Sequence, residues 1–271
     1  MRRAAIFSVF AIGIAAPLAA QNSGYGVLGI GFPARPTSAQ TRALGDGPAT
    51  ADPQSGVNPA ALGLLTKLSV SASAVQEYRT LTMGGVETNG LRQARFPYAI
   101  MAGRFGRSRL SFSVGYYAYA ERTFDLSTTD TLMLRGNPVI LTDQNGSAGA
   151  VVDTRGALAW SVNPSLSIGA AAHFVGGSAR LTARRAFSDS VYRSYVESND
   201  AAFSAFGMSA GVLIVPTAKM RIGVSGRVNT KLQRSILGVR GADLTLPVSL
   251  HAGFDARPNA GVRLAASADW R

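Results

Sequence analysis

Hydrophobic and polar positions alternate strictly along most of the chain after Lys67. In residues 109–121 one face carries Leu110, Phe112 and Val114, and the other carries Ser111, Ser113 and Gly115. The same alternation returns in residues 220–229, 244–256 and 261–270. Because successive side chains of a strand point to opposite faces, this pattern predicts β-strands with one apolar face and one small, polar face.

The alternation predicts about nine strands of unusual length. Many of these runs cover about ten residues, which is the length that a tilted strand needs to cross a bilayer. Strands of soluble proteins are shorter, with a typical length of about 5–6 residues. The predicted strands are residues 67–78, 94–105, 108–121, 150–162, 165–181, 202–215, 218–230, 244–256 and 261–270.

The connections between these strands alternate in length. The short ones are residues 105–108, 163–164, 215–218 and 257–261, and the long, polar ones are residues 79–93, 122–149, 182–201 and 231–243. Short turns on the periplasmic side and long loops outside are typical of outer-membrane barrels. We therefore predict an all-β fold, a transmembrane antiparallel up-and-down β-barrel over residues 67–271. The alternative is a secreted sandwich of two sheets.

The N-terminus predicts export to the cell envelope. Residues 1–20 have a basic start, an apolar stretch and a small-residue end, which is the order of a signal peptide. A retained membrane anchor is the alternative. The absence of cysteine excludes disulfides, thiolate catalysis and cysteine zinc sites. We expect the protein in the cell outer membrane.

The chain is basic, with 27 Lys and Arg against 15 Asp and Glu. An exported protein with scattered arginines is not expected to bind nucleic acid. Outer-membrane lipid and lipopolysaccharide are better partners for this charge. A general arginine bias of the proteome is an equally good explanation.

A turn-rich segment, residues 42–62, precedes the first strand and reads RALGDGPATADPQSGVNPAAL. It resembles the N-terminal signature of the FadL/PorV superfamily of outer-membrane barrels, which includes long-chain fatty-acid transporters and type IX secretion barrels. The residues that carry the resemblance are Arg42, Ala43, Leu44, Gly45, Gly47, Asp52, Asn58, Pro59, Ala60 and Leu62. Asp46 stands where the family has a methionine.

The resemblance implies about fourteen strands in a complete barrel and an N-terminal hatch that fills the lumen. Nine strands is an odd number, so we expect a C-terminally incomplete member of the group. Local chemistry agrees with a folded segment over residues 21–66, because Pro59 suits the first position of a short helix and Asn58 suits its cap. A disordered export tail is the alternative.

The polar face offers little catalytic chemistry. The expected luminal polar residues are His173, Arg221, Arg227, Ser249 and His251. Ser249 and His251 share a strand face and could form a nucleophile–base pair, with Asp255 too far along for a third member. A hydrated imidazole is the simpler interpretation of both histidines. We therefore expect no enzyme, no catalytic residue, no metal site and no cofactor.

The leading functional hypothesis is passive transport of hydrophobic small molecules such as fatty acids across the outer membrane. Residues 21–66 would then gate the periplasmic end. The alternative is a scaffold or secretion component, similar to the PorV branch, that binds an exported protein through its outer loops. A barrel hydrolase that uses Ser249 and His251 is a more remote alternative.

Overall fold

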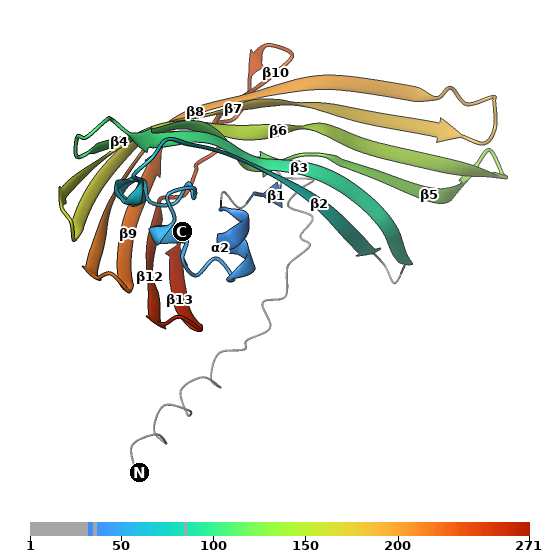
Figure 1. Cartoon of the computed structure of the whole chain (residues 1–271). Coiled ribbons are helices and arrows are strands. Elements are labelled where there is room, and N and C mark those ends of the chain that lie inside the picture. The colour runs from blue at the N-terminus through green and yellow to red at the C-terminus, as the bar shows by residue number, and fades with distance from the viewer. Residues whose placement is uncertain (1–31, 35–36, 84–85) are drawn as a thin grey trace, which may run out of the picture.

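The computed structural model describes residues 32–34, 37–83 and 86–271, so the predicted signal peptide, residues 1–20, lies outside the described residues. Almost all of the described chain is a single antiparallel sheet that curls into a half-barrel (Figure 1). The all-β fold is confirmed, and the two-sheet sandwich is not observed.

Nine long strands form the sheet in sequence order, as an up-and-down meander requires. The path is β13-β12-β9-β8-β7-β6-β4-β3-β2, and every pair along it is antiparallel. Among the described residues β2 and β13 are the two edges of this path. The strands are β2 (Ser69–Met83), β3 (Val86–Arg104), β4 (Leu110–Glu121), β6 (Asn137–Asn163), β7 (Leu166–Phe187), β8 (Tyr195–Thr217), β9 (Met220–Asn229), β12 (Ser249–Asn259) and β13 (Val262–Trp270).

Four further strands that lie off this path, and three short helices, complete the fold. β5 (Phe124–Leu134) pairs with β6, and β1 (Phe32–Pro33) pairs with the far end of β4. β10 (Gln233–Ile236) pairs with β8 and with β11 (Val239–Arg240). The helices are α2 (Ala39–Ala43) and the 3₁₀ turns η1 (Ala49–Ala51) and η2 (Pro59–Leu64), all before the first long strand.

Several strands are longer than the sequence predicts, and this corrects three of the predicted loops. β6 has 27 residues, and most of residues 122–149 and 182–201 belong to β5, β6, β7 and β8. Likewise β2 continues to Met83 and β3 begins at Val86 within the predicted loop 79–93. The extensions of β7 and β8 carry many charged and polar residues, so the regular alternation that marks the predicted strands is weaker there.

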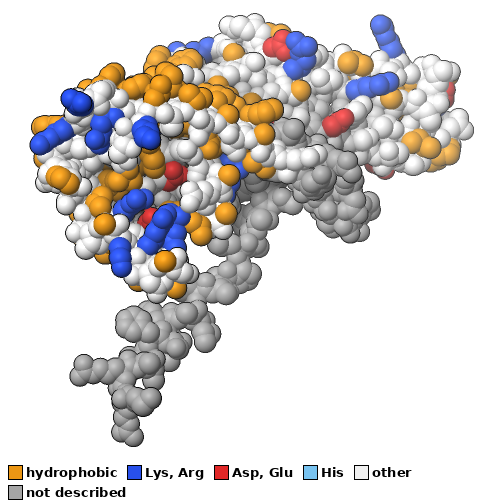
Figure 2. All heavy atoms as spheres, in the orientation of Figure 1, with side chains coloured by type: hydrophobic (Ala, Val, Ile, Leu, Met, Phe, Trp, Pro, Cys, Tyr) orange, Lys and Arg blue, Asp and Glu red, His pale blue; other side chains and the backbone are white. Residues whose placement is uncertain are grey.

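The burial pattern is inverted relative to a soluble protein. Many large apolar side chains of the sheet face outward and are exposed, whereas many small polar side chains face inward and are buried. On β9, for example, Val224 is 53% exposed and its neighbour Ser225 is 3% exposed. On the face seen in Figure 2, outward apolar side chains cover much of the barrel part of the sheet; we call these outward apolar side chains the apolar band. A sheet with lipid outside and polar groups inside has this arrangement.

The concave side of the sheet is filled from both ends. At the end with the short turns, η1 and η2 pack against the sheet, with η2 touching five strands from β3 to β8 and also β9. Toward the other end, Leu232 and Leu246 from the connection between β9 and β12 are buried against Val151, Val175 and Phe203. The region between these two fillings contains the polar side chains described next.

Candidate functional site in the lumen

The N-terminal segment, residues 37–66, is fixed to the inner face of the sheet through Asn58. The Asn58 side chain accepts a hydrogen bond from the backbone N–H of Ala60 (3.0 Å), which caps η2 as the sequence predicts. Its amide donates to the carbonyls of Thr50 (2.9 Å) and Val212 (3.1 Å), the latter on β8. Asn58 therefore joins η1, η2 and the barrel wall in one buried contact.

Glycines on the inner face make room for this segment. A Cβ atom at Gly169 of β7 would lie 2.5 Å from the backbone nitrogen of Ala60. A Cβ at Gly223 of β9 would lie 2.6 Å from the carbonyl oxygen of Thr50. Both distances are shorter than a carbon atom can tolerate, so the helical turns lie directly on the backbone of the sheet.

The residues of the family-like motif build the segment itself. Arg42 and Ala43 end α2, Leu44 follows as its C-cap, and Gly45 has the left-handed φ of +65° that ends the turn. Gly47 is buried against Ala265 of β13. The Asp52 carboxylate accepts hydrogen bonds from Thr41 Oγ1 (2.7 Å) and from the backbone of Gln54 (3.0 Å). Pro59, Ala60 and Leu62 are buried in η2.

A network of buried polar side chains lies next to this segment, and we call it the luminal polar belt. Five adjacent strands contribute to it. Its members are Tyr117 on β4, Asp153 and Arg155 on β6, His173 on β7, Ser209 on β8 and Arg227 on β9.

Asp153 is the centre of the luminal polar belt. Its carboxylate accepts a hydrogen bond from His173 Nδ1 (3.0 Å) and forms an ion pair with Arg227 Nη1 (2.5 Å). Because the carboxylate only accepts, His173 carries its proton on Nδ1, and Nε2 accepts from the Ser209 hydroxyl at 2.8 Å. The chain of bonds thus crosses four strands.

Two arginines of the belt lie over tyrosine rings. The Arg155 guanidinium carbon is 5.8 Å from the Tyr117 ring centroid, and that of Arg227 is 5.5 Å from the Tyr119 ring centroid. Both placements are close enough for a cation–π attraction. Arg155 is only 3% exposed, and its Nε and Nη1 atoms have no hydrogen-bond partner. Stacking on Tyr117 is therefore its main compensation for burial.

The order Asp153, His173, Ser209 has the connectivity of a nucleophilic triad. The three side chains are nevertheless at most 7% exposed, and the N-terminal segment packs on the same face two residues away, at Gly211. With Ser209 enclosed in this way, the network acts as a tie between strands in the described arrangement.

The other polar residues predicted for the lumen also lie on the inner face but belong to separate contacts. His251 Nδ1 lies 2.5 Å from Asp269 of β13, so its bonded partner is this carboxylate and not Ser249. Ser249 lies opposite Arg227 in the β9–β12 register. Arg221 lies 3.8 Å from Asp255, whose main partner is Arg263 at 2.6 Å.

Sequence reasoning missed the central members of the belt. Asp153 and Arg155 were not singled out, although they occupy alternate positions of a strand that is otherwise rich in Ala, Val and Gly. Two opposite charges on the inner face of such a strand were the available signal. Among the described residues no group of three or more His, Cys, Asp or Glu side chains is placed to hold a metal ion. Nor does any described helix have the length and apolar character to span a bilayer.

The curled meander, its outward apolar band and its filled polar interior define an outer-membrane β-barrel type of protein. Comparison with family models identifies the particular group: residues 1–240 match the BamG family, and the chain belongs to it. The match supports association with the outer membrane, and it does not support the FadL/PorV assignment in particular. Searches of curated proteins and of solved structures found no match.

Proposed function

We propose that this BamG family member is an outer-membrane scaffold that holds a partner protein on a projecting sheet. The projecting sheet consists of β5 together with the adjoining parts of β6, β7 and β8, namely residues 124–147 and 178–201. It extends beyond the rest of the sheet at the end away from the short turns (Figure 1).

The observation that carries the proposal is that the projecting sheet carries charged side chains exposed to solvent, several of them in ion pairs across its strands. The Asp143 and Asp200 carboxylates form ion pairs with Arg185 (2.7 Å) and Arg180 (2.9 Å). The hydrogen bond from each arginine lowers the pKa of the carboxyl that it contacts. Such side chains have no place against lipid, so this part of the sheet serves the aqueous side of the membrane.

The projecting sheet also offers binding features. β5 pairs only with β6 among the described strands, so its other edge presents unpaired backbone groups that can bind an extended segment of another protein. A hollow of about 340 Å³ lies on the same sheet. It is lined by Phe124, Asn145, Gly146, Leu181, Thr182, Ala183, Glu197 and Asn199.

Shortening the β5–β6 hairpin tests the scaffold. Leu126 and Asn145 are opposite each other in the register, so residues 127–144 can be replaced by a two-residue turn without changing the strands below. We expect the variant to insert into the outer membrane but to lose any partner that co-purifies with the full chain from native membranes. Retention of the same partner by the shortened variant would contradict the proposal.

Passive transport is the second candidate, because the N-terminal segment occupies the lumen where a gate would lie. The Thr50 hydroxyl lies 2.7 Å from the position of a Cβ at Gly253, so a Thr50→Cys/Gly253→Cys pair can form a disulfide between segment and wall. A conduit predicts saturable uptake of fatty acid into proteoliposomes, lost on oxidation and restored by reduction. The cysteine-free parent is the control. Uptake that is absent in the parent, or unaffected by the disulfide, would exclude gating by this segment.

A further inference from the structure

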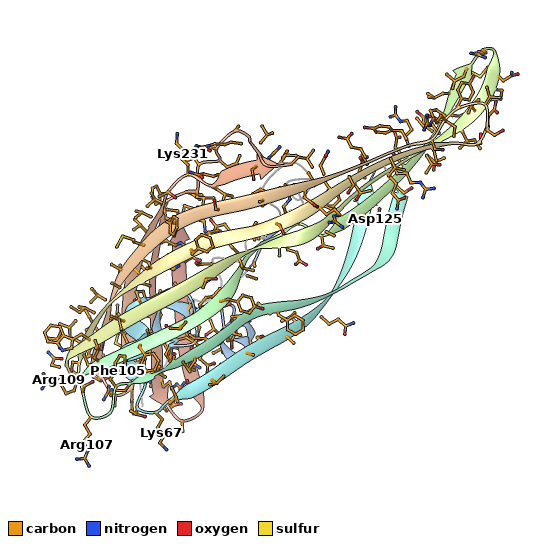
Figure 3. The ribbon with its side chains drawn as sticks, turned by 90° about the horizontal axis from the view of Figure 1, so that it is seen from above. Lys67, Phe105, Arg107, Arg109, Asp125 and Lys231 are labelled. Carbon is orange, nitrogen blue, oxygen red and sulfur yellow. The ribbon has the colours of Figure 1, made fainter. Side chains whose placement is uncertain are left out.

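The exposed carboxylates lie toward one end of the sheet, whereas exposed cations lie at both ends. The exposed acidic residues of the described chain lie away from the short turns, on or beside β5 to β8, in the connection before β12 and near the end of β13; they are Asp125, Asp130, Glu197, Asp200, Asp243 and Asp269. The end with the short turns carries exposed cations instead. Figure 3 shows Lys67, Arg107 and Arg109 together at this end, and Asp125 far from them.

We call the exposed cations at this end the short-turn rim. Its members are Lys67, Arg107, Arg109, Lys219 and Arg257. They come from the start of β2 and from the turns β3–β4, β8–β9 and β12–β13. Lysines and arginines gather around these turns in the space-filling view (Figure 2).

No described carboxylate neutralises the short-turn rim. The Asp255 carboxylate on this side is 3% exposed and already paired with Arg263 and Arg221. Asp52, in the N-terminal segment, accepts bonds from Thr41 and Gln54. Two rim cations instead donate to backbone carbonyls: Arg109 to Val162 (2.9 Å) and Lys219 to Pro258 (3.0 Å). These bonds hold the positive charge at the turns.

The short-turn rim borders the apolar band directly. Phe105, next to the rim, is 47% exposed and packs on Phe112 with 4.6 Å between ring centroids. Trp160, 51% exposed, lies opposite Leu110 and Ile168 near the end of β6. Aromatic side chains beside cations, at the edge of an apolar band, mark the headgroup level of a bilayer.

We infer that the short-turn rim binds the phosphate groups of anionic phospholipids in the leaflet at the short-turn side. Positive charges held at headgroup level attract anionic lipid. The phosphodiester group of such a lipid accepts hydrogen bonds from arginine and lysine side chains. The inference concerns a different surface from the projecting sheet, and its test is independent of any protein partner.

Trp160 provides the measurement, because it lies two residues from the carbonyl that Arg109 contacts. The chain has two tryptophans, so Trp270→Phe leaves Trp160 as the only one. This variant is reconstituted in phosphatidylcholine bilayers that contain a small fraction of brominated phosphatidylglycerol, whose bromines quench tryptophan at short range. Brominated phosphatidylcholine at the same fraction is the reference, because it gives the quenching expected when the protein does not prefer either lipid.

We expect roughly threefold enrichment of phosphatidylglycerol around Trp160 at low salt, decreasing as salt screens the rim. The triple change Arg107→Gln, Arg109→Gln and Lys219→Gln is expected to reduce the enrichment to the level of phosphatidylcholine. The matched control removes the same charge at exposed cations of the other end, Arg184→Gln, Arg193→Gln and Lys231→Gln, and should retain it. Heat-modifiable migration on gels checks that each variant is folded.

Two results would overturn the inference. One is equal quenching by the two brominated lipids in the Trp270→Phe protein, or quenching that the rim variant leaves unchanged. The other is displacement of brominated phosphatidylglycerol by added lipopolysaccharide, which would assign the rim to the phosphates of that glycolipid.

Discussion

At the scale of single residues, the size and polarity of the inward side chains determine what the lumen can hold. Glycine at 169 and 223 lets helical turns lie on the sheet, and the Asp153 carboxylate of the luminal polar belt is paired with Arg227 and hydrogen-bonded by His173. Asp153 has the most important position, because one carboxylate serves both His173 and Arg227. The net contribution of a buried ion pair to stability is small, but removal of one partner is strongly destabilising because it leaves the other charge buried and unpaired.

Removing the Asp153 carboxylate is therefore expected to be severe. Asp153→Ala leaves Arg227 without its ion-pair partner and His173 without an acceptor, at a cost of about 3–5 kcal/mol. Asp200→Ala is the matched control: its ion pair with Arg180 has both side chains more than 60% exposed, so water screens it and the change should have little effect on stability. Urea unfolding in detergent, followed by tryptophan fluorescence, measures both. Equal effects would contradict a structural role for the belt.

At the scale of elements, the sequence predicted the nine-strand meander but not the full length of its strands. Alternation located β4 and β9 to within a few residues, because lipid on one side and polar groups on the other impose it. The outer halves of β6, β7 and β8 are rich in charged and polar residues, so their sequence resembles that of a polar loop and does not indicate a strand. The cap of η2 was predictable because Asn58 and Pro59 are local signals.

The candidate site was predictable only in part, for a related reason. His173 and Arg227 were expected in the lumen from the strand pattern, whereas their shared partner Asp153 depends on the register between β6, β7 and β9. The pairing of His251 with Asp269 depends likewise on the β12–β13 register. The periodicity of the sequence predicts on which face of the sheet a residue lies. Its neighbours on the adjacent strands depend on the register of the strand pairing.

The N-terminal segment is expected to detach from the sheet when a side chain is added at Gly169, where the segment lies on the backbone of β7. Gly169→Ala places a methyl group against the backbone of Ala60, so the segment must move away from β7. Limited proteolysis should then cut within residues 37–66 while the barrel remains intact. Gly156→Ala on β6 is the control, because a Cβ there meets no atom within 4 Å. Resistance to proteolysis equal to that of the parent would show that the segment is not held at this contact.

The connection between β9 and β12 is expected to stabilise the apolar cluster that Leu232 and Leu246 form with Val151, Val175 and Phe203 on the inner face. Leu232 is fully buried in it, so Leu232→Ala should cost about 2–5 kcal/mol. Val239→Ala, at a position that is 72% exposed on β11, should change stability by less than about 0.5 kcal/mol. Urea unfolding of the two variants gives the comparison. A small effect of Leu232→Ala would mean that the loop is dispensable to the core.

At the scale of the whole molecule, three zones follow one another along the barrel axis. Exposed cations lie at the short turns, apolar side chains cover the outward face of the half-barrel, and a sheet with exposed charged side chains projects at the other end. The projecting sheet is visible in Figure 1. Lipid headgroups, acyl chains and water each match one zone. The filled lumen favours a scaffold over an open channel, because both the N-terminal segment and the β9–β12 connection occupy it.

The placement of lipid against the outward face of the sheet is the central claim, and spin labelling of β8 tests it most directly. The chain has no cysteine, so single labels at Met208, Val212 and Ile214 report the outward face, and labels at Ala205, Ser209 and Leu213 report the inward face. In reconstituted bilayers we predict that dissolved oxygen reaches the outward labels strongly and that a water-soluble nickel complex does not. Outward labels that respond to the nickel complex as strongly as labels in the projecting sheet would contradict the account.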